Sequence, residues 1–204
     1  MRENRTSGSV WGPPGNRWLY HDGLLQKIRK LNSMNDPKYF AKGRCTCGEI
    51  HYTVNCKPMF VHCCHCSWCQ RETGSAFALN ALIESERLSI TKGVVEKIQT
   101  PSNSGVGQVI VRCPECQVAL WSHYGAAKEK VAFVRVGTLD NPNVCPPDIH
   151  IFTSSKQSWV ELSDTAAKSE DFYRRSELWP EACVRRYKSA IDAGVKIETI
   201  PERK

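Results

Sequence analysis

The sequence has no run of apolar residues as long as the roughly 18 to 20 that a membrane-spanning helix requires. Its first residues, MRENRTSGSVWGPPGNRW, lack the apolar core of a secretory signal peptide. We also find no internal repeat with a period of about 20 to 50 residues. These absences exclude a transmembrane protein and a repeat array, and we expect no membrane partner. They favour a cytoplasmic or other reducing intracellular location, with organellar targeting by the N-terminal extension left open.

Disulfide bonds are not expected either, although the chain is rich in cysteine. It contains 11 Cys and 6 His in 204 residues. An odd number of cysteines at short spacings, in a chain without an export signal, is typical of metal binding or catalysis. The chain is long enough to bury a core without the help of disulfides.

The formal net charge of +7 is unevenly distributed. Residues 1–44 carry +6 and residues 185–204 carry +3, whereas residues 45–184 carry −2. A nucleic-acid-binding domain gathers its Lys and Arg on the folded surface that meets phosphate. We therefore do not expect nucleic acid as the main partner, and we interpret the basic flanks as solvated tails or a helical extension.

Composition and periodicity divide the chain into three parts. Residues 1–40 form a basic extension, partly disordered, with a short amphipathic helix whose apolar face is Leu24, Leu25, Ile28 and Leu31. Residues 41–165 form a cysteine-rich β-domain, and residues 166–204 form a partly helical C-terminal extension.

Short runs rich in β-branched and aromatic residues, separated by Gly, Pro, Asn or Ser, predict strands in the central part. The runs are EIHYTV, SAFALNALI, LSITKG, VEKIQT, QVIVRC, ALWSHY, KVAFVRVGTL, HIFTS and SWVEL. They indicate a mainly β fold with antiparallel pairing. Helices are expected only at the two ends, the second over PEACVRRYKSAIDAG with Pro180 in its first turn and Gly194 as its C-terminal cap.

Two cysteine pairs predict a closed zinc site. Cys113 and Cys116 form a C-x-x-C turn that directs two thiolates at one ion. Cys45 and Cys47 supply the other half most economically, which ties the start of the domain to a strand 66 residues later. Four thiolates leave a tetrahedral zinc ion no vacant position, so the role of this site is structural.

A second cluster offers three thiolates within six residues, from Cys64, Cys66 and Cys69. Three protein ligands with one open position is the arrangement that catalytic zinc needs. Three thiolates make the ion a weak Lewis acid and a good partner for a soft fourth ligand such as an exogenous thiolate.

Two properties of this second site are not decided by cysteine spacing alone. Cys63, His62 or His65 could close it, which would make both zinc ions structural. Cys63 could also replace Cys64 as a ligand, since Cys63, Cys66 and Cys69 recur at the helical spacing of three residues. The separate Cys56, Cys145 and Cys183 are interpreted as small buried apolar residues.

These residues resemble the glutathione-dependent formaldehyde-activating enzyme (GFA) family, which also contains centromere protein V. The resemblance runs from Gly43 to Leu162 and rests on an ordered set of motifs. They are Gly43-Arg44-Cys45-Thr46-Cys47-Gly48, Cys64-His65-Cys66-Ser67-Trp68-Cys69-Gln70-Arg71 with Gly74-Ser75, Cys113-Pro114-Glu115-Cys116, Gly137-Thr138-Leu139-Asp140, His150-Ile151 and Trp159. The chain departs from the pattern at Gln117, where the family commonly has Gly, and at the additional thiol of Cys63.

The resemblance implies an Mss4-like antiparallel β-domain with two zinc ions. It places the structural zinc on Cys45, Cys47, Cys113 and Cys116, and the catalytic zinc on Cys64, Cys66 and Cys69 in preference to Cys63. It also implies a carbon-sulfur lyase similar to S-(hydroxymethyl)glutathione synthase, with glutathione as a co-substrate.

The leading hypothesis is a zinc enzyme that binds a small-molecule thiol or thiol adduct of a carbonyl at the open site. Catalytic roles go to Cys64, Cys66, Cys69 and His65, the last as a proton shuttle. Arg71 would bind a carboxylate of the glutathione-like substrate. One alternative keeps the enzyme but replaces formaldehyde with a larger electrophile. Another is a zinc-stabilised binding module, similar to centromere protein V, whose basic tail binds nucleic acid or another polyanion. The sequence does not indicate the oligomeric state.

Overall fold

The computed structural model describes residues 40–192 except residues 103 and 126. The amphipathic helix predicted in the N-terminal extension and the predicted cap at Gly194 lie outside these residues. In the described part, no helix is long and apolar enough to cross a membrane.

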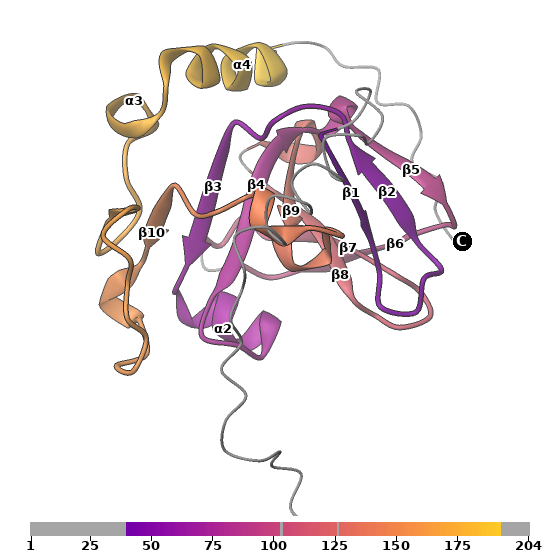
Figure 1. Ribbon diagram of the computed structural model, residues 1–204, viewed down its shortest axis with the longest axis horizontal. Coiled ribbons are helices and arrows are strands. Elements are labelled where there is room, and N and C mark those ends of the chain that lie inside the picture. The colour runs from indigo at the N-terminus through magenta and orange to yellow at the C-terminus, as the bar shows by residue number, and fades with distance from the viewer. Residues whose placement is uncertain (1–39, 103, 126, 193–204) are drawn as a thin grey trace, which may run out of the picture. The chain divides into compact units, whose positions relative to one another are not determined.

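Two β-sheets make up most of the described structure (Figure 1). The small sheet has the order β1-β2-β5, and the large one has the order β11-β10-β3-β4-β9-β8-β7-β6. The strands are β1 (Ala41–Arg44), β2 (His51–Val54), β3 (Phe60–Cys64), β4 (Ala78–Glu84), β5 (Leu88–Lys92), β6 (Glu96–Thr100), β7 (Gln108–Arg112), β8 (Ala119–Tyr124), β9 (Val131–Arg135), β10 (Ile149–Ile151) and β11 (Ala167–Lys168). The prediction of a mainly β domain is confirmed.

The described α-helices are few and short. They are α2 (Ser67–Thr73), α3 (Arg175–Leu178) and α4 (Glu181–Asp192), with single 3-10 turns at Ser85–Arg87, Lys128–Lys130, Val136–Thr138, Pro142–Val144 and Thr153–Ser155. The helix predicted near the C-terminus is α4, which begins directly after Pro180. Figure 1 shows α4 at one end of β3 and α2 at the other.

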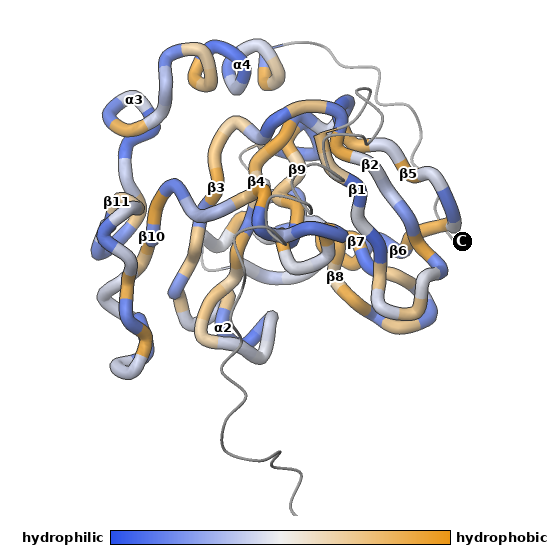
Figure 2. Tube along the Cα trace, viewed as in Figure 1, coloured by the Kyte–Doolittle hydropathy of each residue, from blue (hydrophilic) through white to orange (hydrophobic). Residues whose placement is uncertain are grey.

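Strand β4, near the middle of the large sheet, is buried on both faces, and most of its residues are apolar. Ile83 of β4 packs into a core shared with Tyr52 of the small sheet and Trp121 of β8. Its neighbour Leu82 points to the opposite face and packs into a second core that includes Trp179. Figure 2 colours most of β4 as hydrophobic, in agreement with this central place.

The C-terminal segment is held on the second face by an aromatic stack and an ion pair. The Trp179 ring stacks on Phe60 of β3 with centroids 5.1 Å apart. The guanidinium of Arg186 binds both carboxylate oxygens of Glu84, at 2.7 and 2.6 Å. These contacts fix α4 to the end of β4.

Three local expectations differ from the structure. The run SWVEL at 158–162 forms no strand, and its Trp159 side chain is 71% exposed. A helix occurs inside the domain, α2, where only strands and loops were expected. Strand β10 pairs in parallel with both β3 and β11, whereas the other pairs of described strands are antiparallel.

Gly43 of β1 is required because the Tyr52 ring occupies the space of a side chain. A Cβ at this position would lie 2.8 Å from Cε1 of Tyr52 and closer still to Cζ. The Tyr52 ring cannot move easily, since it is buried against Trp121 and its hydroxyl lies 2.6 Å from Oγ1 of Thr138. We expect Gly43→Ala to lower the free energy of unfolding by about 1–3 kcal/mol.

The matched control for this substitution is Gly137→Ala, because a Cβ there meets nothing within 4 Å. Its free energy of unfolding should stay within about 0.5 kcal/mol of wild type. Urea unfolding followed by tryptophan fluorescence measures both. Equal destabilisation of the two variants would contradict the steric explanation.

Candidate metal centres

Two turns bring four thiols together between the sheets. Cys45 and Cys47 lie in the turn between β1 and β2, and Cys113 and Cys116 lie in the turn between β7 and β8. Their four sulfur atoms are all within 4.8 Å of one another, with 3.4 Å from Cys45 to Cys47 and 3.6 Å from Cys47 to Cys113. Zn–S bonds of about 2.3 Å in a tetrahedron place sulfurs about 3.8 Å apart, so this group fits a zinc ion.

Gln117, at the position where the resemblance led us to expect Gly, keeps this turn intact. Its φ of 58° lies in the left-handed region that glycine adopts without strain. The side-chain amide donates to the carbonyl of Pro114 at 3.0 Å and to Glu96 at 3.2 Å. These bonds help hold the C-x-x-C turn, so the departure affects the local backbone and leaves the thiols in place.

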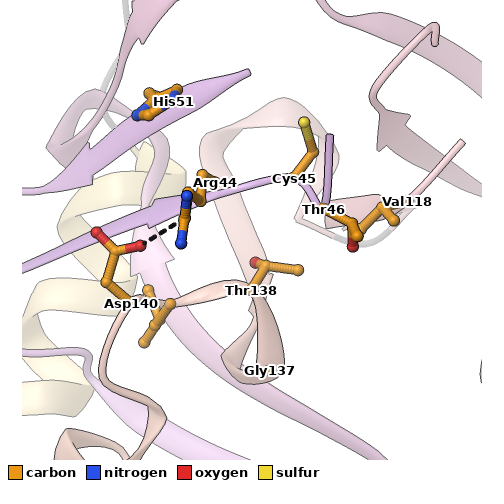
Figure 3. Close-up of a pocket in the computed structure, with 9 residues that line it drawn as sticks. Arg44, Cys45, Thr46, His51, Val118, Gly137, Thr138 and Asp140 are labelled. Atoms are coloured by element: carbon orange, nitrogen blue, oxygen red, sulfur yellow. Dashed lines mark ion pairs between the residues drawn. The ribbon is translucent and has the colours of Figure 1, made fainter. Parts of the chain in front are cut away.

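The Gly137–Asp140 motif lies beside this four-thiol group and joins it to β1. Both segments line a cavity of about 630 Å³. Figure 3 shows the lining residues, with Arg44 and Asp140 forming an ion pair. The Nε to Oδ1 distance of this ion pair is 3.3 Å, and both side chains are about half exposed. Thr138 bonds to the hydroxyl of Tyr52 and to the carbonyl of Arg135. These contacts give the motif a structural explanation.

A second group of thiols lies where β3 leads into α2. Cys64 ends the strand, Cys66 is the N-cap residue of the helix, and Cys69 lies in its first turn. Their sulfur atoms are all within 4.8 Å of one another, and the three residues are buried. No fourth Cys, His or carboxylate of the described residues joins this group.

The helix start favours negative charge on this group. The Cys69 amide donates to the sulfur of Cys66 at 3.4 Å, as an N-cap bond. Hydrogen bonds from the Cys64 and Cys69 thiols, together with the backbone amides of Cys69 and Trp68, hold the pKa of the Cys66 thiol well below its usual range. The donor set therefore fits a soft or borderline cation.

The three residues that could have closed this second site lie elsewhere. Side chains alternate along β3, so Cys63 points to the face opposite Cys64. Cys63 instead forms a third group with His65 and His150, whose ligand atoms are also within 4.8 Å of one another. His62 lies 2.7 Å from the hydroxyl of Tyr173. The proton-shuttle role predicted for His65 would require a proton path from the group of Cys63, His65 and His150 to the three-thiol group.

Arg71 lines an open cavity of about 410 Å³ beside α2. Gln70, Gly74, Ser75, Ala76, Gln157 and Trp159 form the rest of the lining. The indole of Trp159 donates to Gln157 at 2.8 Å, Gln157 donates to Gln70 at 3.1 Å, and Gln70 donates to the carbonyl of His65 at 2.7 Å. This chain of bonds holds the cavity wall against the segment that carries the three thiols.

The sequence of residues 40–155 matches the glutathione-dependent formaldehyde-activating enzyme family, which is more than half of the chain. The chain belongs to this family. No curated protein matches it. Among solved structures it is similar to a Rhodobacter sphaeroides structural-genomics protein, with 21% identity over 50% of this chain and 92% of the other, and a TM-score of 0.40. As a GFA family member it has a mainly β fold, and its cysteine groups are consistent with two zinc sites.

Sequence analysis missed two buried polar residues of this GFA domain. His150 belongs to a family motif but was given no role, because only the pairing of β10 with β3 places it beside Cys63. Arg135 donates to Asn80 at 2.5 Å and to Ser122 at 3.2 Å. Its positive charge favours the thiolate form of Cys69 and so opposes the rise in the pKa of that thiol. A lone Arg in a predicted strand gives no sign of burial, so no sequence signal was available for it.

Proposed function

We propose that this chain is a zinc-dependent carbon-sulfur lyase that makes and breaks the adduct between a thiol, such as glutathione, and formaldehyde or a similar carbonyl. The observation that carries the proposal is the three-thiol group at the start of α2, which has no fourth ligand from the described residues. Membership of the GFA family supports the same reaction class.

Two zinc ions are part of the proposal. Cys45, Cys47, Cys113 and Cys116 would hold the structural ion, and Cys64, Cys66 and Cys69 would hold the other. When bound there, a zinc ion with three protein ligands supplies one free coordination position for a soft ligand such as a thiolate.

The overall reaction needs no oxidant or reductant. The sulfur of the thiol forms a bond to the carbonyl carbon, the carbon–oxygen π bond breaks, and the thiol proton ends on the new hydroxyl through solvent. The reverse reaction cleaves the same carbon–sulfur bond. The protein accelerates it by holding thiol and carbonyl in one orientation, which removes an entropic part of the barrier.

The chain's own residues bind and orient the substrate in this scheme. Arg71, at the cavity beside α2, pairs with a carboxylate of the thiol. Trp68, which is 39% exposed and lies between Cys66 and Cys69 in sequence, offers an apolar contact next to the thiol group. His65 has no assigned step, because its ring contacts Cys63 and His150 instead.

The proposal is tested by measuring exchange between free glutathione and its formaldehyde adduct by NMR, with and without the full-length protein. Because the reaction also proceeds without enzyme, the expected result is an exchange rate above the protein-free rate and proportional to protein concentration. A series of larger aldehydes in the same assay identifies the preferred carbonyl. Rates equal to the uncatalysed ones for every carbonyl would reject the lyase.

Arg71→Ala should raise KM for glutathione about fivefold, the effect of losing about 1 kcal/mol of pairing at an exposed site. For cysteamine, which has a thiol and no carboxylate, KM should not change. Arg71→Lys should restore part of the difference, since it keeps the charge. Equal effects on the two thiols would remove Arg71 from carboxylate recognition.

A polyanion-binding function similar to that of centromere protein V depends on the basic residues 1–44, most of which lie outside the described structure. Loss of salt-sensitive nucleic-acid binding on deletion of this segment would support it, and absence of binding at low salt would reject it.

A further inference from the structure

A buried group of one thiol and two imidazoles lies on the face of β3 opposite the three-thiol group. The sulfur of Cys63 is 3.6 Å from Nε2 of His65, and that nitrogen is 3.0 Å from Nδ1 of His150. The exposed fractions of Cys63, His65 and His150 are 2%, 0% and 8%. All three ligand atoms lie within 4.8 Å of one another.

The backbone explains why these side chains meet. Cys63 and His65 are two residues apart in an extended segment, so they project to the same side, while Cys64 and Cys66 project to the other. Strand β10 pairs in parallel with β3 and sets His150 opposite Cys63. The amide of His65 also donates to the carbonyl of Ile151 at 3.0 Å, which extends this pairing past the end of β3.

Hydrogen bonding alone satisfies this group poorly. The close contact between His65 and His150 uses one nitrogen from each ring. The other two nitrogens, Nδ1 of His65 and Nε2 of His150, are buried without a hydrogen-bond partner. Buried polar atoms are normally paired, because each unpaired one costs about 1–3 kcal/mol. These two nitrogens point away from the shared contact, so the case for a ligand rests on the three atoms that meet in it: Sγ of Cys63, Nε2 of His65 and Nδ1 of His150.

We propose that Cys63, His65 and His150 form a third metal site, for a cation of the zinc class. Zinc bonds of about 2.3 Å to sulfur and about 2.0–2.1 Å to nitrogen place a tetrahedral S and N about 3.6 Å apart and two N atoms about 3.3 Å apart. The observed 3.6 and 3.0 Å are close to these separations. A solvent molecule completes the four ligands.

Charge supports the same assignment. A divalent ion with one thiolate has a formal charge of +1, whereas a divalent ion with three thiolates has −1. Cys63 and Cys64 are adjacent, so the two charges lie on opposite faces of a single strand and offset each other. The third ion connects β3 to β10 and so holds the segment from which α2 begins.

Zinc K-edge X-ray absorption on the zinc-saturated full-length protein tests the site without any substitution. The four-thiol and three-thiol groups contain no histidine. We expect three zinc ions per chain by elemental analysis, and imidazole scattering in a ratio of two nitrogens to eight thiolate sulfurs. Two zinc ions per chain with an all-sulfur environment would overturn the proposal.

Two variants locate the third ion. Cys63→Ser and His150→Gln should each lower the zinc content from three to two and remove the imidazole signal. Cys145→Ser is the matched control, because Cys145 is equally buried and belongs to none of the three groups. It should retain three zinc ions. An imidazole signal that persists in both variants would show that the ion lies elsewhere and would reject the site.

Discussion

Cys113→Ala is expected to unfold the β-domain at room temperature. Cys113 is fully buried and its sulfur is 3.6 Å from that of Cys47, so the four-thiol group joins the β1–β2 turn to the β7–β8 turn. A structural zinc contributes about 10–16 kcal/mol in zinc-finger peptides, whereas a whole domain is stable by about 5–15 kcal/mol. Loss of one ligand removes enough of this contribution to exceed the net stability. Circular dichroism and zinc content of the purified variant measure the effect.

Cys145→Ala provides the control, because Cys145 packs in the same core between the sheets but belongs to no thiol group. It should lose only about 1 kcal/mol of stability and no zinc. A strong chelator should reproduce the effect of Cys113→Ala on wild type. A folded Cys113→Ala variant with unchanged zinc content would contradict a stabilising role for the four-thiol group.

The strands that sequence analysis placed correctly have turn-forming residues at both ends. QVIVRC became β7 and ALWSHY became β8, and each is bounded by residues that turn the chain. Side chains alternate along β4, so Leu82 and Ile83 pack into different cores. Both positions must be apolar because both faces of this strand are buried. Local signals were sufficient here because neighbouring hairpin strands pair with each other.

The elements that sequence analysis placed wrongly lack a reliable local signal. All five residues of β3 are buried, so this strand has no polar alternation to reveal it. Helix α2 has seven residues, too few for an apolar period, and its start is fixed by the sulfur of Cys66. SWVEL has strand-forming residues but no partner strand, which leaves Trp159 on the surface.

The cysteine groups were predictable to the extent that ligands lie close in sequence. Spacing paired Cys113 with Cys116 and gathered Cys64, Cys66 and Cys69, and the structure brings each set together. Spacing could not decide between Cys63 and Cys64, because both fit a C-x-x-C or C-x-C pattern with Cys66. In the structure the two side chains point to opposite faces of β3, so only Cys64 joins the three-thiol group. Cys63 instead meets His150, which is 87 residues away in sequence.

Replacing Cys66 should abolish the proposed lyase activity while the fold remains. Cys66 supplies one of three sulfurs and also caps α2. We expect Cys66→Ala to lose one zinc ion and to lower the catalysed exchange rate at least about 100-fold, which corresponds to about 2.7 kcal/mol in the barrier. The lost cap costs about 1 kcal/mol of stability, too little to unfold a domain held by the four-thiol group.

Cys66→Ser separates the two functions of this residue. A serine hydroxyl is a good N-cap acceptor but a poor zinc ligand, so this variant should regain the stability that Cys66→Ala loses and should remain inactive. Stability and activity would then respond to different properties of one side chain. If Cys66→Ser instead kept full activity with one fewer zinc ion, the three-thiol group would not be the reaction site. If both variants unfolded, this group would be structural, as the four-thiol group is.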